Sequence, residues 1–290
     1  MFQRIPLHIH NETGRLRSVI LGIADDRSAD NHKNNPKYAE IVKRGEDPAD
    51  EALISEINNF GELLKRHGVT VFRPENIPNR TQIFARDIAF VIGDTLVRSN
   101  LRHENRRKET VAIDNLLERI EKKITPPQEA LIEGGDVVLW NDYVFVGQGE
   151  RTNKAGYEFL KTELKDKKVV PINLNVTNEG KSSIVHLDYA FQPVGRDCAI
   201  IYEGAFPVKP QIIYDIFAEQ NLIKVTQEEM YEMFPNVFSI SSEIVVVESG
   251  FERLISELEK RKIKVERIEY SNISKLGGLL RCSTLPLNRD

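Results

Sequence analysis

The stretch "GGDVVLWNDYVFVGQG", residues 134–149, predicts two short apolar strands joined by a tight turn at Asn141-Asp142. Asparagine and aspartate favour such turns because both tolerate a left-handed backbone. A helix is predicted at about 153–167, and the apolar segment "KVVPINL", residues 168–174, predicts a third strand. The unit therefore has the order strand, turn, strand, helix, strand.

The same order recurs along the chain with a period near 50 residues, in pattern rather than in identity. Self-similarity at this period is typical of a closed or stacked repeat architecture. The absence of a low-complexity linker favours one domain over residues 1–290. The other complete units begin at the strand pairs 87–99, 183–203 and 236–250, with turns at Gly93-Asp94 and Gly195-Arg196 and helices at about 105–122, 207–220 and 251–262.

The first unit departs from this order. It begins with the strand "LRSVILG" at 16–22 and continues with a helix at 47–68, but it lacks a clear second strand. The polar segment 24–50 stands in that place. Long polar connections of this kind are often functional, so this one is predicted to be a mobile loop or lid.

The composition argues against several classes of protein. The chain has 290 residues, a hydrophobic fraction of 40% and a net charge of −4, which disfavours a nucleic-acid-binding surface. No apolar run approaches the roughly 20 residues that a membrane helix needs. The N-terminal sequence lacks the apolar segment of a signal peptide, and two cysteines do not make a disulfide framework. A cytoplasmic protein with free thiols is therefore expected.

Unusual polar residues fall at one phase of the repeat. Asp87 opens the second unit, Glu133 the third and Asn236 the fifth; His186 is placed in the first strand of the fourth, and Cys282 follows one further period on. If the units surround an axis, these positions converge on one central cavity. Chain ends usually fray, so a cysteine so close to the C-terminus suggests that the end is held there to help form the site.

A cysteine and a histidine in one cavity indicate thiolate nucleophilic catalysis, with His186 lowering the pKa of Cys282 or moving protons. Carboxylates beside a thiol raise its pKa, so the acids indicate that the ligand is a cation. A guanidinium fits because it is planar, permanently charged and pairs bidentately with carboxylates. Asp87 and Asp188 could clamp its two ends, while Glu133 could hold the imidazolium.

The motifs "FARD" (84–87), "EGGD" (133–136), "HLD" (186–188) and the terminal "GG…RC" (277–282) resemble those of the guanidino-group-modifying superfamily. This superfamily includes arginine deiminases, dimethylarginine dimethylaminohydrolases, agmatine deiminases and amidinotransferases. The resemblance covers nearly the whole chain, with all four motifs in order. It implies an α/β fold, the five-bladed pseudo-symmetric propeller of ββαβ units known as the pentein fold, which agrees with the repeat.

The resemblance also implies roles for individual residues. Cys282 matches the nucleophile, His186 the general acid and base, and Glu133 the carboxylate paired with that histidine. Asp87 and Asp188 match the guanidinium clamp. In the family's mechanism the cysteine attacks the guanidinium carbon, an amine leaves, and water or an acceptor amine resolves the covalent adduct.

Three further expectations concern the substrate. Deiminases bind the substrate carboxylate with an arginine after the "RD" motif; among Arg98, Arg102 and Arg106 we favour Arg106. Asn236 is assigned to substrate binding. The short interval before Glu133 has no room for the helical domain that larger deiminases insert, which favours compact hydrolases of arginine or dimethylarginine. The tail also departs from the agmatine deiminase pattern.

The expected function is hydrolysis of a guanidinium C–N bond in arginine or an arginine derivative, without metal or cofactor. Transfer of the amidino group to an amine is the alternative. A ribosome-binding translation factor shares the fold, but it would not need Cys282, His186 and the acids together. A papain-like protease has its cysteine before its histidine, which is the opposite order. The expected ligand is a small guanidine, and the oligomeric state is left open.

Overall fold

The computed structural model describes residues 3–177 and 180–290. Its described strands form five three-stranded sheets, with the strand orders β15-β1-β2, β3-β4-β5, β6-β7-β8, β9-β10-β11 and β12-β13-β14. These five sheets fit the five predicted repeats. The strands are β1 (Leu16–Leu21), β2 (Thr70–Phe72), β3 (Ala89–Ile92), β4 (Thr95–Arg98), β5 (Lys123–Ile124), β6 (Val137–Trp140), β7 (Tyr143–Gln148), β8 (Lys168–Asn173), β9 (Phe191–Val194), β10 (Cys198–Ile201), β11 (Leu222–Lys224), β12 (Phe238–Ser241), β13 (Ile244–Glu248), β14 (Lys264–Ile268) and β15 (Thr284–Arg289).

Each sheet pairs its first two strands antiparallel and its last two parallel, for example β6 with β7 and β7 with β8. Left-handed backbone at Gly93, Asn141 and Gly195, with φ of 60°, 55° and 67°, permits tight turns between the paired strands. The three predicted turns are confirmed. The parallel third strand requires a crossover, and helical segments supply it.

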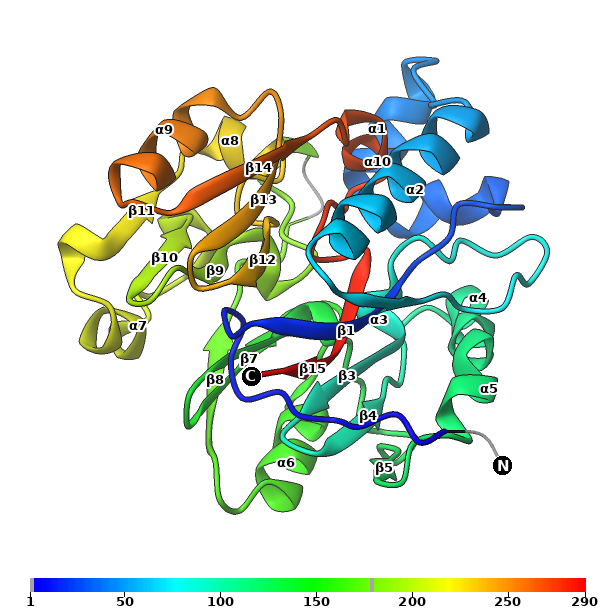
Figure 1. Ribbon diagram of the computed structural model, residues 1–290, viewed down its shortest axis with the longest axis horizontal. Coiled ribbons are helices and arrows are strands. Elements are labelled where there is room, and N and C mark those ends of the chain that lie inside the picture. The colour runs from blue at the N-terminus through cyan, green and yellow to red at the C-terminus, as the bar shows by residue number, and fades with distance from the viewer. Residues whose placement is uncertain (1–2, 178–179) are drawn as a thin grey trace.

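The first sheet is completed by the far end of the chain. Strand β15 pairs antiparallel with β1, with Leu21 opposite Thr284, and β1 pairs parallel with β2. Figure 1 shows β15 and β1, the red and blue ends of the chain, side by side. The sequence reading left the first unit without a second strand; its antiparallel strand comes from the C-terminus. Segment 24–50 stands outside the sheet.

Two helix predictions are corrected. Segment 105–122 is not one helix but two short helices around a 3₁₀ helix, Lys108–Ile113, which contains the β-branched Thr110, Val111 and Ile113. Segment 207–220 has its α-helix only at Gln211–Ile216, since Pro207 and Pro210 disfavour helix before them, and a separate 3₁₀ helix, Glu219–Asn221, begins near its end. The α-helices are α1 (Pro36–Lys43), α2 (Asp50–Arg66), α3 (Ala85–Ile88), α4 (Glu104–Arg107), α5 (Asp114–Leu117), α6 (Lys154–Glu163), α7 (Gln211–Ile216), α8 (Gln227–Tyr231), α9 (Glu252–Lys260) and α10 (Ser271–Lys275).

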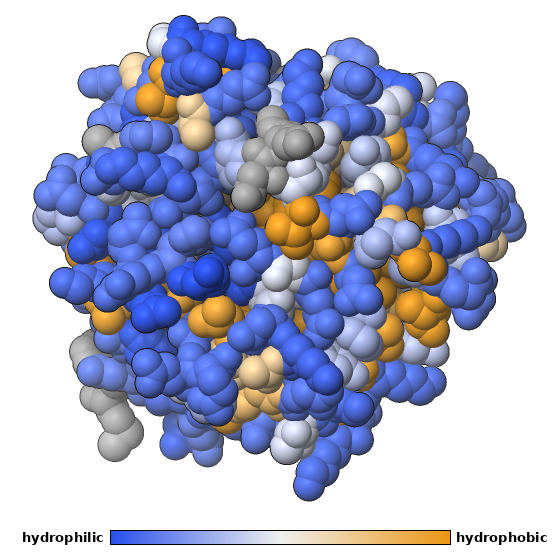
Figure 2. Space-filling model, turned by 180° about the vertical axis from the view of Figure 1, so that it is seen from behind, coloured by the Kyte–Doolittle hydropathy of each residue, from blue (hydrophilic) through white to orange (hydrophobic). Residues whose placement is uncertain are grey.

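Helix α2 shows how the longer helices cover the sheets. It buries Leu53, Ile57, Phe60 and Leu64 at helical spacing in the larger of two hydrophobic clusters. Outside, the surface is polar: Figure 2 shows one face that is mostly hydrophilic with separate apolar patches. In the described part of the chain no helix combines the length and apolarity that crossing a membrane requires.

The segment predicted as a lid is helical. It contains the 3₁₀ helix η1 (Ala29–Asn34) and α1, whose first turn is capped by the side chain of Asn35. Arg27, near the start of the segment, forms ion pairs with Asp47 and Asp50, near its end, so these pairs join the two ends. Its mobility stays a prediction.

Candidate active site

Apart from Arg106, which lies in α4, the predicted site residues occupy the short segments that lead into the first strand of each sheet. Asp87 lies in α3 before β3, and Glu133 precedes the 3₁₀ helix η3 (Gly134–Asp136) before β6. Asn236 and Cys282 come just before β12 and β15. His186 was placed inside a strand by the sequence reading; the structure puts it before η5 (Leu187–Tyr189), and β9 begins only at Phe191.

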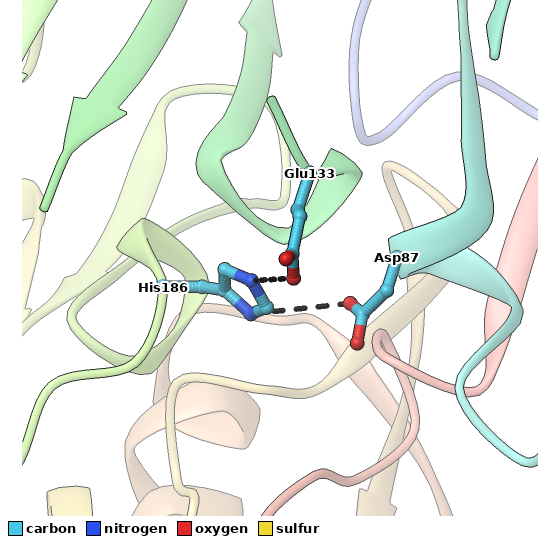
Figure 3. Close-up of side chains that lie close together, drawn as sticks. All are labelled: Asp87, Glu133 and His186. Atoms are coloured by element: carbon cyan, nitrogen blue, oxygen red, sulfur yellow. Dashed lines mark hydrogen bonds and ion pairs between the residues drawn. The ribbon is translucent and has the colours of Figure 1, made fainter. Parts of the chain in front are cut away.

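These short segments lie close together in space, as their side-chain contacts show. Nδ2 of Asn236 donates to Sγ of Cys282 (3.2 Å), and that thiol donates to Oδ2 of Asp188 (3.5 Å). Nε2 of His186 lies 2.9 Å from Oε2 of Glu133, and its Nδ1 lies 3.9 Å from Oδ1 of Asp87. Figure 3 shows Glu133 and Asp87 approaching the imidazole from separate elements. The predicted convergence is therefore present.

A cavity of about 20 Å³ lies beside the thiol. Space of this size holds about one water molecule. The lid segment contributes Asn34 and Asn35 to that wall. The lining residues are Asn34, Asn35, Phe84, Asp87, Arg106, Arg151, Val185, His186, Leu276, Gly277 and Cys282.

The imidazole of His186 is charged at neutral pH. Burial alone would lower the pKa of His186, but the charge of Asp87 and the hydrogen bond to Glu133 raise it to about 9. For Glu133 burial acts in the opposite direction and would raise the pKa, yet Arg151 and His186 hold that pKa well below its usual range. The pair is an imidazolium next to a carboxylate, so His186 can donate a proton.

The thiol of Cys282 is neutral in this environment. Burial raises the pKa of Cys282 well above its ordinary value, and the charges of Asp188 and Asp87 raise it further. A cation that neutralised these two acids would remove part of that shift. The site therefore favours a thiolate only when a positive ligand is bound.

Asp87 and Asp188 each have one oxygen in a hydrogen bond and one without a hydrogen-bond donor among the described residues. Oδ2 of Asp87 accepts from Nη1 of Arg106 (3.0 Å), and Oδ2 of Asp188 accepts from Nη1 of Arg281 (2.9 Å). Both Oδ1 atoms are buried without a hydrogen bond there. Buried carboxylate oxygens normally have donors, so these two are suited to receive the N–H groups of a ligand.

Asn236 holds the cysteine loop. Its Oδ1 accepts from the backbone N–H groups of Cys282 (3.0 Å) and Leu279 (3.2 Å), and its Nδ2 faces the sulfur. The structure thus shows a bond to the backbone of Cys282, whereas the predicted contact with substrate stays a prediction.

Arg106 lines the cavity, but acids already engage its guanidinium. It donates to both carboxylate oxygens of Glu109 (2.8 to 3.2 Å) and to Asp87. Arg98 pairs with Asp114, and Arg102 donates its backbone N–H to Glu133. Binding of a substrate carboxylate by Arg106 stays a prediction.

Sequence reasoning missed Arg151, a second arginine on the cavity wall. It is buried; Nη1 donates to Glu133 (3.2 Å), Nη2 donates to the backbone oxygen of Asn34, and Nε has no partner in the described chain. Arg151 follows the second strand of its sheet rather than preceding the first. The repeat phase that marked the other residues could not mark it.

The two glycines of "EGGD" are required by close packing. A Cβ on Gly134 would lie 2.2 Å from the backbone oxygen of Arg86, and one on Gly135 would lie 2.5 Å from Nδ1 of His186. The imidazole therefore packs directly on the backbone of Gly135, which fixes its position beside Glu133.

Replacing Gly135 with alanine should displace the imidazole of His186. We expect kcat to fall by at least about tenfold, since misplacing a catalytic group by about 1 Å can cost roughly a hundredfold. Gly149→Ala is the matched control, because a Cβ there meets only ordinary contacts of 3.5 Å or more. Steady-state kinetics with circular dichroism would check this; a folded Gly135→Ala variant with unchanged kcat would contradict it.

Asp87, Glu133 and His186 also form the one metal-ligand group found among the described residues, with ligand atoms within 4.8 Å of one another. The charges disfavour a metal: Glu133 pairs with Arg151, Asp87 with Arg106, and His186 is protonated. A metal ion would have to displace a proton and two guanidinium contacts. The absence of a resident metal stays a prediction.

Comparisons with known proteins show the family of the chain. Residues 24–289 match the family described as N,N dimethylarginine dimethylhydrolase, eukaryotic. An uncharacterized protein, YkgA of Bacillus subtilis, is 31% identical over 229 residues, which cover 79% of this chain and 77% of that protein. An arginine deiminase of Clostridium perfringens is 24% identical over 330 residues, covering 96% of this chain and 76% of the enzyme.

Solved structures share the fold. The amidinotransferase SxtG of the saxitoxin pathway of Microseira wollei has a TM-score of 0.81 at 18% identity, covering 98% of this chain and 97% of that one. The N-terminal domain of the cyanobacterial arginine dihydrolase ArgZ, with substrate bound, has a TM-score of 0.81 at 19% identity, covering 94% and 98%. The mixed α/β fold and the site define a member of the guanidino-group-modifying superfamily. Within it, the chain belongs to the N,N dimethylarginine dimethylhydrolase family.

Proposed function

We propose that the protein is a cysteine-dependent hydrolase that cleaves a guanidinium C–N bond of arginine or an N-substituted arginine. The observation that carries this proposal is the pair of buried Oδ1 atoms of Asp87 and Asp188. Both lack donors in the described chain, and both acids raise the pKa of Cys282. A guanidinium supplies N–H donors for both acids and the positive charge that the thiol needs.

In the proposed reaction, guanidinium binding releases the thiol proton to solvent, and the thiolate of Cys282 bonds to the guanidinium carbon. The imidazolium of His186 protonates the departing nitrogen, and the C–N bond breaks to leave a cationic thioether adduct. The neutral imidazole then takes a proton from a water molecule that adds to the same carbon. The C–S bond then breaks, and the released thiolate takes the proton of the added hydroxyl group, which leaves the neutral ureido product.

Several features support this assignment beyond the acids. His186 and Cys282 line the same cavity, and Glu133 holds the imidazolium as a proton donor. On the wall, Nε of Arg151 has no hydrogen-bond partner in the described chain and is available to a substrate carboxylate, whereas Arg106 would have to exchange a contact with Glu109 or Asp87 to bind one. In this proposal residues 1–290 form one catalytic domain, a five-bladed propeller of ββαβ units, that acts in the cytoplasm on a small guanidine.

Amidino transfer is the second candidate, because SxtG and this chain share a fold and both reactions begin with a cysteine adduct. The two adducts differ in composition. When a terminal nitrogen leaves, the adduct on sulfur retains the alkyl chain through the former guanidinium carbon. When the alkyl amine leaves, only the amidino group stays on sulfur.

Mass spectrometry of protein quenched during turnover tests the proposal. Arginine, N,N-dimethylarginine and agmatine would each be supplied, with and without glycine as acceptor. We expect an adduct on the peptide of Cys282 that retains the alkyl chain, and turnover without glycine. An amidino-only adduct with turnover that depends on glycine would replace the hydrolase by a transferase. If none of the three guanidines gave an adduct or any turnover, both the hydrolase and the transferase would be rejected.

A further inference from the structure

Arg86, next to the clamp residue Asp87, has a buried guanidinium that no described residue satisfies. The residue is 5% exposed, and its Nε and Nη2 have no hydrogen-bond partner in the described chain. Its backbone is well held, since its N–H donates to the carbonyl of Cys282 (3.0 Å). An arginine fixed by its backbone with its charged group buried and unpaired requires an explanation.

The charges around Arg86 do not balance locally. Its guanidinium interacts electrostatically with Arg281 and Arg289 and with the acids Glu12 and Asp188. Arg281 already occupies both acids, donating to Glu12 (2.8 Å) and Asp188 (2.9 Å). These five buried groups comprise three cations and two anions, so one positive charge is left over.

Arg289 and Arg281 add further unsatisfied donors to this cluster. In Arg289, Nη1 donates to the backbone oxygen of Gly14 (2.7 Å) and the guanidinium lies 5.1 Å from the ring centre of Phe238, while Nε and Nη2 have no partner in the described residues. Nε of Arg281 is likewise without a partner there. Five buried N–H-bearing atoms on three side chains therefore lack acceptors.

We propose that Arg86, Arg281 and Arg289 bind a small inorganic anion of the halide class inside the protein. Water molecules could accept from the N–H groups, but they would leave the extra charge uncompensated, which is strongly destabilising in an interior. An anion satisfies both requirements. None of the three arginines lines the cavity beside Cys282, so this site is separate from the guanidine site.

The site has a structural role in this proposal. Arg281 directly precedes Cys282 and holds Asp188, while Arg86 holds the carbonyl of Cys282. The anion would stabilise the folded state through the segments that carry the nucleophile and its clamp.

Thermal unfolding in matched concentrations of sodium chloride and sodium gluconate tests the proposal. We expect chloride to raise the Tm of the full-length protein by about 3 °C or more relative to gluconate, as anion binding to the folded state alone predicts. The chloride effect should disappear in Arg86→Met and Arg289→Met. It should persist in Arg196→Met, whose arginine is exposed. Equal Tm values in both salts for the wild type would overturn the proposal.

Crystals of the wild-type protein grown with bromide give a test that needs no variant. We expect an anomalous peak within hydrogen-bond distance of the guanidinium of Arg86. Water density at this position without anomalous signal, or bromide bound only at the surface, would reject the anion site while leaving the proposed hydrolase untouched.

Discussion

Replacing Cys282 with alanine is expected to lower kcat by at least about 10⁴-fold, because loss of a covalent nucleophile removes the whole reaction path. Substrate binding should be retained, since Asp87 and Asp188 remain in place to receive the guanidinium. The thiol that is removed is uncharged, because burial and the two acids raise its pKa, so the substitution changes no charge in the site. Turnover by steady-state assay, together with binding of the same guanidine by calorimetry, would measure the two effects separately.

Cys198→Ala is the matched control for this experiment. Cys198 is also buried, and burial together with its bond to Asp197 raises the pKa of that thiol to about 11, so it is expected to be unreactive. Its loss should leave kcat within about twofold of wild type, as expected for a residue with no part in the transition state. Near-normal turnover in Cys282→Ala, or inactivity in a folded Cys198→Ala, would contradict covalent catalysis by Cys282.

Four of the five units could be predicted in full because each repeats the same local pattern, whereas the first lacks a local second strand. Paired apolar strands such as 137–140 and 143–148 are joined by residues that accept left-handed backbone. The site could be predicted from the phase of the repeat, because residues at equivalent positions of the units would converge if the units surround an axis. Asp87, Glu133 and His186 are far apart in sequence, yet contacts of 2.9 and 3.9 Å bring them together.

Other features depend on tertiary contacts that no local pattern contains. Arg151 reaches the site from the far end of β7, where the repeat marks no functional position. The pairing of β15 with β1 joins residues from opposite ends of the chain. Arg86 belongs to the motif "FARD", but the sequence gives no sign that its guanidinium is buried without an acceptor.

The position of the acids explains why the resting thiol can be protected. Asp87 and Asp188 raise the pKa of Cys282, so the sulfur is a poor nucleophile toward general electrophiles until a cation arrives. In the proposed reaction the same carboxylates bind that cation. Substrate recognition and activation of the nucleophile are thus one electrostatic event, and a single acid should affect both in opposite directions.

Asp87→Asn is expected to separate these two effects. Loss of the charged clamp should lower kcat/KM by roughly 30- to 150-fold, which corresponds to about 2–3 kcal/mol for a charge-assisted hydrogen bond. Loss of the same charge should lower the pKa of Cys282 in the free enzyme, because Asp87 is one of the groups that raise it. The rate of alkylation by iodoacetamide as a function of pH measures that pKa directly.

The sign of the alkylation result distinguishes the proposed clamp from a structural role. In the wild type, alkylation should stay slow up to pH 9, because burial and both acids keep the thiol protonated. In Asp87→Asn the midpoint should move to lower pH while turnover falls. Asp94→Asn, which changes an exposed aspartate, should alter neither quantity. A variant that lost turnover and kept the wild-type alkylation midpoint would show that Asp87 does not act on the thiol, and a folded variant with normal kcat/KM would show that the guanidinium is bound elsewhere.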